Sequence, residues 1–415
     1  MKKYLFFIRE FNDWDHIAPI IYYLAKKNSS KIYICFYKKD LRYTNLFKYL
    51  EKTVGPNLNV FYLPQEKLNF INKFLIKVIN KLSRLLKLGK ILDIENKTSD
   101  NDLRKLFEII NVKDCNRIVV IFDRYTDPFL QQVQNQLKGI DPIFVTCPHG
   151  PNTNVNRMIY TDQMKKGRNF NYLRMNTKEQ LLKYFQYYNY LIFTDHIELE
   201  FNEKYCIPFE DSLLDKSRIK VLGSIRYCRE WLEHVENFTP KIVKKDTGKI
   251  KIVFFMKKFK HNVFKDEVYR TIELFASFPN IDFYIKPHTR GMILPSKMNA
   301  PNVHICNESC SSSLINIADV IFFYGGTSII LEALAEKKFT VCLDYLDANK
   351  NIYDHFNACK VLKCRDDLCL FLDSDISNQK DNNKTSGEKI LKEIVYAGGH
   401  SVSVSDRYIN FFENL

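Results

Sequence analysis

Long apolar runs are missing from this sequence. No stretch approaches the roughly 20 apolar residues that a membrane-spanning helix requires. The first apolar run is too short for a secretory signal core and ends in the charged pair Arg9-Glu10, so we interpret it as a β-strand. Internal repeats of solenoid length are missing too. These absences predict a cytoplasmic protein that crosses no membrane.

Cysteine pairs of the kind that bind zinc are also missing. The chain has eleven cysteines, an odd number, and no Cys-x-x-Cys pair. The closest groups are Cys306 with Cys310, and Cys359 with Cys364 and Cys369; neither has histidines at zinc-finger spacing. We therefore expect buried free thiols, which fits a reducing cytoplasm.

Positive charge, by contrast, is abundant. The formal net charge of +14 draws a protein toward polyanions. In 67–92, basic residues recur every three or four positions among apolar ones, which is the pattern of a cationic amphipathic helix. Such a helix either packs on the protein's own core or lies on an anionic membrane surface as a peripheral anchor. We expect no nucleic-acid partner, because no recognition motif accompanies the charge.

Length and composition indicate two globular domains. A chain of 415 residues exceeds one ordinary core, and 46% apolar residues exclude a disordered chain. Strands are predicted at 3–8, 31–37, 117–122, 142–146 and 190–194, and again at 251–256, 281–286, 302–306, 320–324 and 339–344. Helices are predicted at 17–27, 264–278, 312–318, 327–337 and 406–415. This alternation predicts the α/β fold class, with two Rossmann-like doubly wound domains.

A stretch that is rich in lysine and poor in apolar residues separates the two halves. We place an N-terminal domain at 1–236, a linker at 237–250 and a C-terminal domain at 251–400. The last segment, 401–415, predicts a helix that could return to the first domain. Functional groups of parallel sheets gather at the carboxyl ends of the strands, so polar residues just after each strand are the candidates for a site.

One strand-to-helix turn has the composition of an anion site. Gly325 and Gly326 allow a phosphate to approach the backbone closely, and Thr327 and Ser328 can cap the following helix. The first N–H groups of that helix attract negative charge. Glu332 lies one turn further on the same side as Ser328 and can accept hydrogen bonds from ribose hydroxyls.

This run, followed by Lys337-Lys338-Phe339, resembles the donor-site strand, helix and strand of GT-B glycosyltransferases and of the related hydrolysing sugar-nucleotide 2-epimerases. The resemblance implies a GT-B fold whose active site lies in the cleft between two domains. It also implies that the C-terminal domain binds the nucleotide and that Glu332 binds its ribose. The resemblance covers the second domain well and the first by architecture alone.

A second motif, Lys286-Pro287-His288, follows the strand predicted at 281–286. It resembles the Lys-Pro-His or His-Pro turn of bacterial transferases that use cytidine-activated donors, namely capsule sialyl- and Kdo-transferases and teichoic-acid glycerophosphotransferases. The resemblance implies that His288 contacts the donor phosphate. Lysine and imidazole can neutralise a phosphate as the leaving group departs, and Lys257 adds a third cation. The alternative is a proline-terminated strand with solvated bases.

Two histidines of the first domain are candidate catalytic bases. Asp13 and His16 precede the predicted helix at 17–27, where many GT-B enzymes keep a catalytic or acceptor-binding residue. An imidazole titrates near neutral pH and can take the proton of an attacking hydroxyl. His149 is the rival base, because Pro148-His149-Gly150 resembles the His-Gly turn of the glycerophosphotransferases. A packing or capping role is the alternative for both histidines.

Asp13-Trp14-Asp15 also matches the Asp-x-Asp pattern that holds a metal in GT-A enzymes. It comes too early in the chain, and the two-domain pattern favours the metal-independent type. We expect no metal and no cofactor beyond the nucleotide-activated donor, which is a substrate. Lysine, histidine and a helix dipole would take the place of Mg²⁺.

Together these features predict an enzyme, a GT-B glycosyltransferase that moves a sugar from a CMP- or UDP-activated donor to a surface glycan. The expected acceptor is a glycan or lipid-linked glycan of the capsule, lipopolysaccharide or teichoic-acid kind, at the inner face of the plasma membrane. The alternatives are a CDP-glycerol-type glycerophosphotransferase, a hydrolysing UDP-sugar 2-epimerase and a non-catalytic GT-B assembly subunit. The epimerase signature His-x-Glu-Ala-Gly is absent, since His149 is followed by Gly-Pro-Asn.

Overall fold

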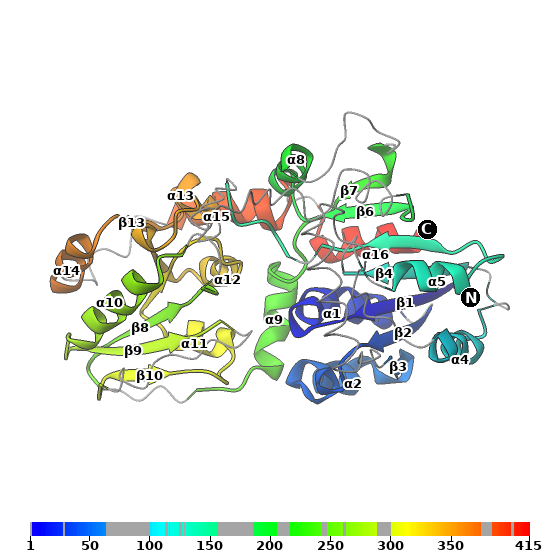
Figure 1. The fold of residues 1–415 in the computed structure, drawn as a ribbon, viewed down its shortest axis with the longest axis horizontal. Coiled ribbons are helices and arrows are strands. Elements are labelled where there is room, and N and C mark those ends of the chain that lie inside the picture. Colours follow the sequence, from blue (N-terminus) through cyan, green and yellow to red (C-terminus); the bar gives the residue numbers. More distant parts are fainter. Residues whose placement is uncertain are drawn as a thin grey trace, which may run out of the picture.

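The computed structural model shows two lobes side by side, with both chain termini in the same lobe (Figure 1). It describes residues 2–27, 30–63, 100–112, 115, 117–123, 127, 129–148, 150–155, 186–205, 216–242, 247–259, 263–288, 300–374, 384–399 and 402–415. The cationic helix predicted at 67–92 lies outside the described residues, and so does His149.

The first lobe is built on seven parallel strands in the order β3-β2-β1-β4-β5-β6-β7. They are β1 (Lys2–Ile8), β2 (Lys31–Phe36), β3 (Leu58–Tyr62), β4 (Arg117–Phe122), β5 (Ile143–Thr146), β6 (Tyr190–Phe193) and β7 (Ile219–Val221). Each strand predicted in the first half falls on one of these elements. Strands β3 and β7 were not predicted, because edge strands are only partly buried and lack a continuous apolar run.

The second lobe is built on six parallel strands in the order β10-β9-β8-β11-β12-β13. They are β8 (Ile250–Phe255), β9 (Ile281–Lys286), β10 (Val303–Ile305), β11 (Val320–Phe323), β12 (Phe339–Leu343) and β13 (Lys360–Leu362). The strand order reverses beside β1 in the first sheet and beside β8 in the second, which is the doubly wound arrangement. The predicted α/β fold class is confirmed.

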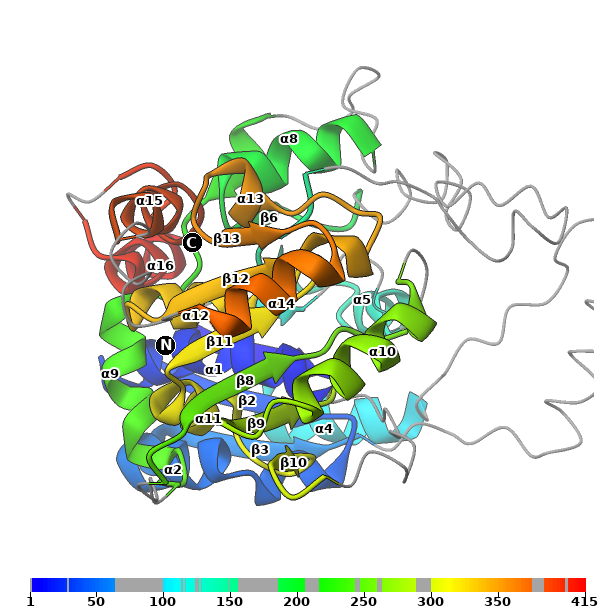
Figure 2. The ribbon, with the colours of Figure 1, turned by 90° about the vertical axis from the view of Figure 1, so that its left-hand side faces the viewer.

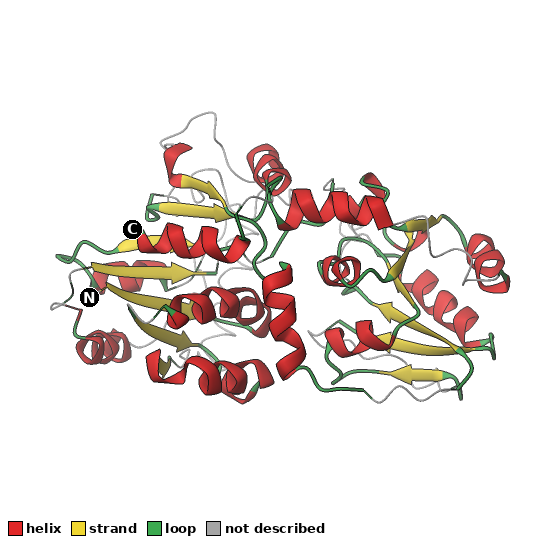
Figure 3. Cartoon of the chain, turned by 180° about the vertical axis from the view of Figure 1, so that it is seen from behind, coloured by secondary structure: helices red, strands yellow, loops and turns green. Residues whose placement is uncertain are grey.

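The strands of both sheets point toward the middle of the molecule (Figure 3). Ligands of open α/β sheets bind beyond the carboxyl ends of the strands, at the point where the strand order reverses. In this protein those points belong to β1 and β4 in one lobe and to β8 and β11 in the other. The two sheets therefore aim their ligand-binding ends at the space between the lobes.

Helices cover both faces of the first sheet, because successive residues of a strand point to opposite sides. In β1, Tyr4, Phe6 and Ile8 join one buried cluster, while Leu5 and Phe7 join another. The first cluster includes α1 (Phe11–Lys26), α2 (Asn45–Val54), α9 (Arg229–Phe238) and α16 (Val404–Glu413). The second includes α4 (Asp100–Ile110) and α5 (Leu130–Gln136). Helix α8 (His196–Tyr205) follows β6.

The second sheet is covered in the same way. Helices α10 (Lys265–Ala276) and α14 (Arg365–Asp373) pack with Ile252 and Phe254 on one face. Helices α11 (Ser311–Ile317) and α12 (Ile329–Ala335) pack with Val253 and Phe255 on the other (Figure 2). The short helix α13 (Ile352–His355) precedes β13. Because Phe255 belongs to the same buried cluster as Phe6 of β1, the packing is continuous between the lobes.

Helix α1 begins earlier than the sequence predicts. The prediction has a loop through His16 and a helix from residue 17, but the helix starts at Phe11. Glu10 and Asp13 form a capping box that satisfies the N–H groups at the helix start. Pro19 lies inside the helix, where the hydrogen bond that it removes is compensated by the burial of ten of the sixteen helix residues. Asp13 and His16 therefore lie on a buried helix and not in a loop.

Two of the described segments connect the lobes. Helix α9 lies between them and includes Asn237 and Phe238, the first two residues of the predicted linker (Figures 1 and 3). Helix α15 (Lys384–Ile390) packs against α12 of the second lobe, and a π-helical turn at Leu391–Val395 continues it. The last helix, α16, packs on the first lobe, where the hydroxyl of Tyr4 donates to the carbonyl of Phe412 at 2.8 Å.

The cysteines that the structure describes are free thiols, as predicted. Burial was predicted as well, but it holds for only five of them: Cys35, Cys147, Cys228, Cys342 and Cys359. Among the described residues, no helix is long and apolar enough to cross a membrane.

Candidate functional site

A cavity of about 470 Å³ lies between the lobes and is lined by residues of both. The residues from the first lobe and from α9 include Asn12, Asp15, His16, Thr44, Asn45, Arg226, Tyr227 and Phe238. The residues from the second lobe include Met256, Lys286, Pro287, His288, Asn307, Glu308, Ser309, Cys310, Ser312, Thr327 and Ser328. The cavity thus lies where the carboxyl ends of the two sheets face one another.

Of the two predicted catalytic residues that the structure describes, His16 lines this cavity and Asp13 does not. His16 lies on α1, and its ring meets the ring of Tyr227 edge-on at a centroid distance of 5.7 Å. Gly150 packs against the imidazole as well. A Cβ at Gly150 would lie 2.7 Å from His16 Nε2, and the φ of +118° suits glycine alone. Residue 150 therefore has to be glycine for His16 to keep this position.

The Asp-x-Asp pair is divided by the geometry of α1. Residues two apart on an α-helix are rotated by about 200°, so Asp13 and Asp15 point to opposite sides. Asp13 is fully buried and accepts a hydrogen bond from the backbone N–H of Glu10 at 3.0 Å. Asp15 lines the cavity, where its carboxylate lies 2.8 Å from Arg226 Nε. Asp13 is thus part of the helix cap, and its neighbour Asp15 is the cavity residue.

Arg226, which the sequence analysis missed, joins the two lobes. Its side chain is 6% exposed, and its Nη2 donates to Glu332 of α12 at 3.1 Å while Nε pairs with Asp15 of α1. Burial alone would lower the pKa of Arg226, but the two carboxylates raise it above its ordinary value. The only sequence signal was its position after the Gly223-Ser224 break.

Glu332 lies beside the cavity wall and not on its surface. The residue is 3% exposed, and burial raises the pKa of its carboxyl even though Arg226 acts to lower it. The ion pair with Arg226 already occupies one carboxylate oxygen. A ribose would therefore reach Glu332 only in an arrangement in which this ion pair is open.

Lys286 and His288 stand at the end of β9. The ammonium of Lys286 donates to the backbone carbonyls of Cys306 at 3.2 Å and Asn307 at 2.8 Å, and burial lowers its pKa. It therefore fixes the loop after β10, which forms part of the cavity wall. His288 is half-buried and lines the cavity itself.

The two glycines of the predicted phosphate turn are covered by protein groups. Gly325 has a φ of +61°, and a Cβ there would lie 3.0 Å from Lys257 Nζ, which is paired with Asp347 at 2.8 Å. A Cβ at Gly326 would lie 2.5 Å from Thr153 Oγ1. These glycines therefore permit close packing in this structure. The next two residues, Thr327 and Ser328, line the cavity, and Ser328 accepts a hydrogen bond from the hydroxyl of Tyr227 at 3.0 Å.

A segment of the first lobe, residues 150–155, reaches across to the second. Asn154 forms an antiparallel bridge with Asn351. The backbone N–H of Val155 donates to the carbonyl of Lys350 at 3.0 Å, and that of Ile352 donates to the carbonyl of Thr153 at 3.1 Å. These long-range bonds fix the lobes to one another next to Gly326, and nothing in the local sequence signals them.

A buried group of charges lies at the carboxyl ends of β1 and β4, and none of its members lines the cavity. Arg9 lies 3.4 Å from Asp123 Oδ2 and 3.6 Å from Asp127 Oδ2, and the hydroxyl of Tyr37 donates to Asp127 at 3.2 Å. Burial raises the pKa of Asp127 to about 6 and the pKa of Asp123 well above its ordinary value. This group couples the stability of the first lobe to pH.

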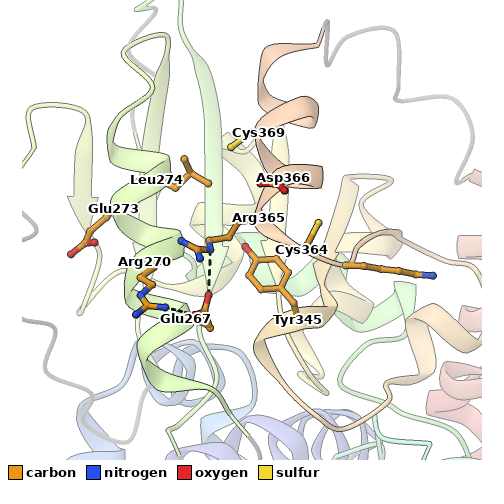
Figure 4. Close-up of a pocket in the computed structure, with 10 residues that line it drawn as sticks. Glu267, Arg270, Glu273, Leu274, Tyr345, Cys364, Arg365, Asp366 and Cys369 are labelled. Carbon is orange, nitrogen blue, oxygen red and sulfur yellow. Dashed lines mark hydrogen bonds and ion pairs between the residues drawn. The ribbon is translucent and has the colours of Figure 1, made fainter.

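Another hollow, of about 710 Å³, lies on the second lobe between α10 and α14 (Figure 4). Its lining is charged, but Arg270 and Arg365 pair with Glu267 at 2.7 and 3.3 Å. None of the first-lobe residues that the structure describes lines it. The cavity between the lobes is the better candidate, because residues of both lobes line it, among them five of the predicted site residues: His16, Lys286, His288, Thr327 and Ser328.

Groups of three or more histidine, cysteine or acidic side chains placed to hold a metal ion are not found among the described residues.

No family model matches the sequence. No curated protein matches it either. Solved structures, however, match over nearly the whole chain. A UDP-N-acetylglucosamine 2-epimerase is 11% identical with a TM-score of 0.53, and the match covers 97% of this chain and 99% of that one. MnaA of S. aureus with UDP is 11% identical with a TM-score of 0.53, covering 100% and 98%. The glycosyltransferase SnogD of Streptomyces nogalater is 9% identical with a TM-score of 0.50, covering 100% and 99%.

These similarities define the class of architecture. The protein has the GT-B fold, two Rossmann-like domains that face one another across a cleft. Identities of 9–11% show a shared fold, so the reaction has to be argued from the residues of this chain.

Proposed function

We propose that this protein is a glycosyltransferase that moves a sugar from a nucleotide-activated donor to a glycan acceptor in the cavity between the lobes. The observation that carries the proposal is the composition of that cavity. Its first-lobe wall presents His16, and its second-lobe wall presents His288, Thr327 and Ser328 at the carboxyl ends of β9 and β11. A base thus faces a group of phosphate-binding side chains across one space.

The second-lobe wall is suited to the donor. His288 and the hydroxyls of Thr327 and Ser328 can donate hydrogen bonds to phosphate oxygens, and the cationic Lys286 lines the same cavity. Fixed donors and cations stabilise the negative charge that develops on a leaving nucleotide. We propose that these residues bind the phosphates and that Glu332 binds the ribose once its ion pair opens.

The first-lobe wall is suited to the acceptor. In the proposed step, an acceptor hydroxyl attacks the anomeric carbon of the donor sugar, and the bond from that carbon to the phosphate oxygen breaks. His16 takes the hydroxyl proton, and the nucleotide leaves with the bonding electrons. The ring contacts with Tyr227 and Gly150 fix the imidazole, which a general base requires. Asp13 contributes by capping the helix that carries His16.

The donor and acceptor classes belong to the same proposal. Lys286-Pro287-His288 favours a cytidine nucleotide over a uridine one, and a surface glycan or lipid-linked glycan is the proposed acceptor. MnaA, which shares the fold, was solved with UDP, so uridine donors belong in the test. The proposed contact of 67–92 with an anionic membrane surface at the cytoplasmic face concerns residues that the structure does not describe.

Nucleotide binding is the first test. CMP, UDP, CDP-glycerol, CMP-sialic acid and UDP-N-acetylglucosamine are added to the purified chain, and the melting temperature is followed. A ligand at 100 times its Kd stabilises the folded state by about 2.7 kcal/mol. We expect one nucleotide class to give a clear shift that His288→Asn reduces. If none of the five ligands changes the melting temperature, the donor assignment is wrong.

Catalysis is the second test. With the nucleotide sugar that binds, His16→Asn should lower turnover by about 10²–10⁴-fold while nucleotide affinity stays the same. His355→Asn, which removes an exposed histidine on α13, is the matched control and should leave turnover unchanged. Product analysis without acceptor separates the reaction classes, because a 2-epimerase converts the nucleotide sugar by itself.

A further inference from the structure

The guanidinium of Arg226 has one nitrogen with no assigned role. Nη2 donates to Glu332, and Nε lies in an ion pair 2.8 Å from Asp15 without forming a hydrogen bond. Nη1 is buried and has neither an ion-pair nor a hydrogen-bond partner among the described residues. Such an unpaired charged donor is costly, and buried polar groups normally find an acceptor. Because Arg226 lines the cavity, an oxygen of a bound molecule is the natural acceptor.

The local charge selects the kind of oxygen. Two carboxylates, Asp15 and Glu332, surround one guanidinium, so the group carries a net charge of −1 when both are ionised. A phosphate would meet repulsion there, whereas a neutral hydroxyl would not. The Asp15 side chain is 23% exposed, and its carboxylate retains lone pairs that can accept a hydrogen bond from a hydroxyl group. Arg226 and Asp15 thus offer a hydrogen-bond donor and a hydrogen-bond acceptor side by side.

The surroundings suit a sugar. Asn12, Asp15 and His16 all line the cavity, at spacings of three and four residues that place them on one face of α1. A sugar has hydroxyls on adjacent carbons, and each can both donate and accept a hydrogen bond. A sugar held by Asp15 and Arg226 would therefore place its hydroxyls near the imidazole of His16, the residue that follows Asp15.

We propose that Asp15 and Arg226 form a subsite that binds adjacent hydroxyls of a sugar. This inference rests on the proposed function and goes beyond it, because it names the residues that recognise the sugar. The hydroxyls belong either to the ribose of the nucleotide or to the acceptor sugar. The two sources share one chemistry and are separated by experiment.

The test uses Asp15→Asn in the full chain. This change keeps the shape of the side chain but replaces a hydroxyl-accepting oxygen by an amide donor, and it leaves Arg226 paired with Glu332, so the fold is retained. Asp40→Asn is the matched control, because Asp40 is exposed on the 3₁₀ turn at Lys39–Tyr43. Arg226→Lys is the second variant, which keeps the positive charge but removes the planar guanidinium with its several N–H donors.

Two sets of probes distinguish the sources. UDP and CMP are compared with their 2′-deoxy forms by calorimetry, and free galactose, N-acetylglucosamine and glycerol are compared by saturation-transfer NMR. If the subsite binds ribose, Asp15→Asn lowers affinity for the ribonucleotides at least tenfold and leaves the 2′-deoxy forms unchanged. If it binds the acceptor, Asp15→Asn abolishes saturation transfer to the free sugars, and nucleotide affinity stays within twofold. The control matches the wild type in both cases.

The inference is overturned if Asp15→Asn and Arg226→Lys change neither class of ligand. It is overturned as well if the wild-type protein binds ribonucleotides and 2′-deoxynucleotides equally and none of the free sugars gives saturation transfer. If the protein binds no nucleotide but binds free sugars, and Asp15→Asn abolishes this binding, the subsite is supported and the proposed function is refuted. The two proposals therefore fail separately.

Discussion

Removal of the Arg226 guanidinium should destabilise the contact between the lobes. Arg226→Met keeps most of the apolar stem and leaves the carboxylates of Glu332 and Asp15 without their cation. Breaking a buried ion pair by removing one partner costs about 3–5 kcal/mol, because the remaining charge stays buried. At about 2–4 °C for each kcal/mol in a domain of roughly 200 residues, the melting temperature should fall by at least about 6 °C.

A neighbouring residue provides the control. Arg229 lies three residues further on, is 85% exposed and pairs with Glu233 at 3.4 Å on the surface of α9. An exposed pair of this kind contributes about 0.3–0.5 kcal/mol, so Arg229→Met should lower the melting temperature by no more than about 2 °C. Differential scanning calorimetry of the two variants beside the wild type at pH 8 makes the comparison.

The effect of Arg226→Met should depend on pH. Without the guanidinium, the folded-state pKa of Glu332, which burial already raises, moves further above its unfolded value. A raised carboxyl pKa destabilises the fold at high pH, and the penalty disappears as the carboxyl is protonated in both states. The deficit in melting temperature should thus be largest at pH 8 and shrink toward pH 5. An equal, small deficit for both arginine variants at every pH would refute the buried ion pair.

Three further outcomes are expected. Gly326→Ala should lower the melting temperature, because its methyl group would lie 2.5 Å and 2.6 Å from two first-lobe side-chain oxygens, whereas Gly387→Ala, with its nearest atom at 3.6 Å, should not. Tyr227→Phe, which removes a 3.0 Å hydrogen bond to Ser328, should speed hydrogen exchange at the start of α12. Asp127 has a raised pKa of about 6, so its protonation stabilises the wild type at low pH, and this contribution is lost as pH rises through about 6. The melting temperature of Asp127→Asn relative to wild type should therefore rise between pH 5 and 7.5.

Much of the fold could be predicted from short stretches of sequence. The strands 117–122 and 281–286 were predicted with the bounds that the structure shows, because a strand buried on both faces appears as an apolar run that ends in polar residues. The start of α1 was not predicted correctly, because Glu10 is an uncommon N-cap and the residues through His16 were interpreted as a loop. Where capping or burial outweighs local propensity, the sequence pattern alone misplaces the boundary.

Some residues of the candidate site could be predicted from the sequence, and others could not. His16, His288 and Ser328 could be named beforehand, since each follows a strand of a parallel sheet and such strands end at one edge. Arg226 could not, because its importance comes from partners on α1 and α12 that are 211 and 106 residues away along the chain (226 − 15 and 332 − 226). No local pattern encodes a contact of that range.

The sequence by itself determined the central strands of both sheets, several of the helices and the polar side chains at strand ends, because these follow from the pattern of apolar residues over a few positions. Only the tertiary structure decided that Asp15 and not Asp13 faces the cavity, that Glu332 is paired with Arg226, and that Gly326 is covered from the first lobe. These properties depend on how two separately encoded sheets pack against one another. That packing is set by the sum of many distant contacts and is visible in no single stretch of the chain.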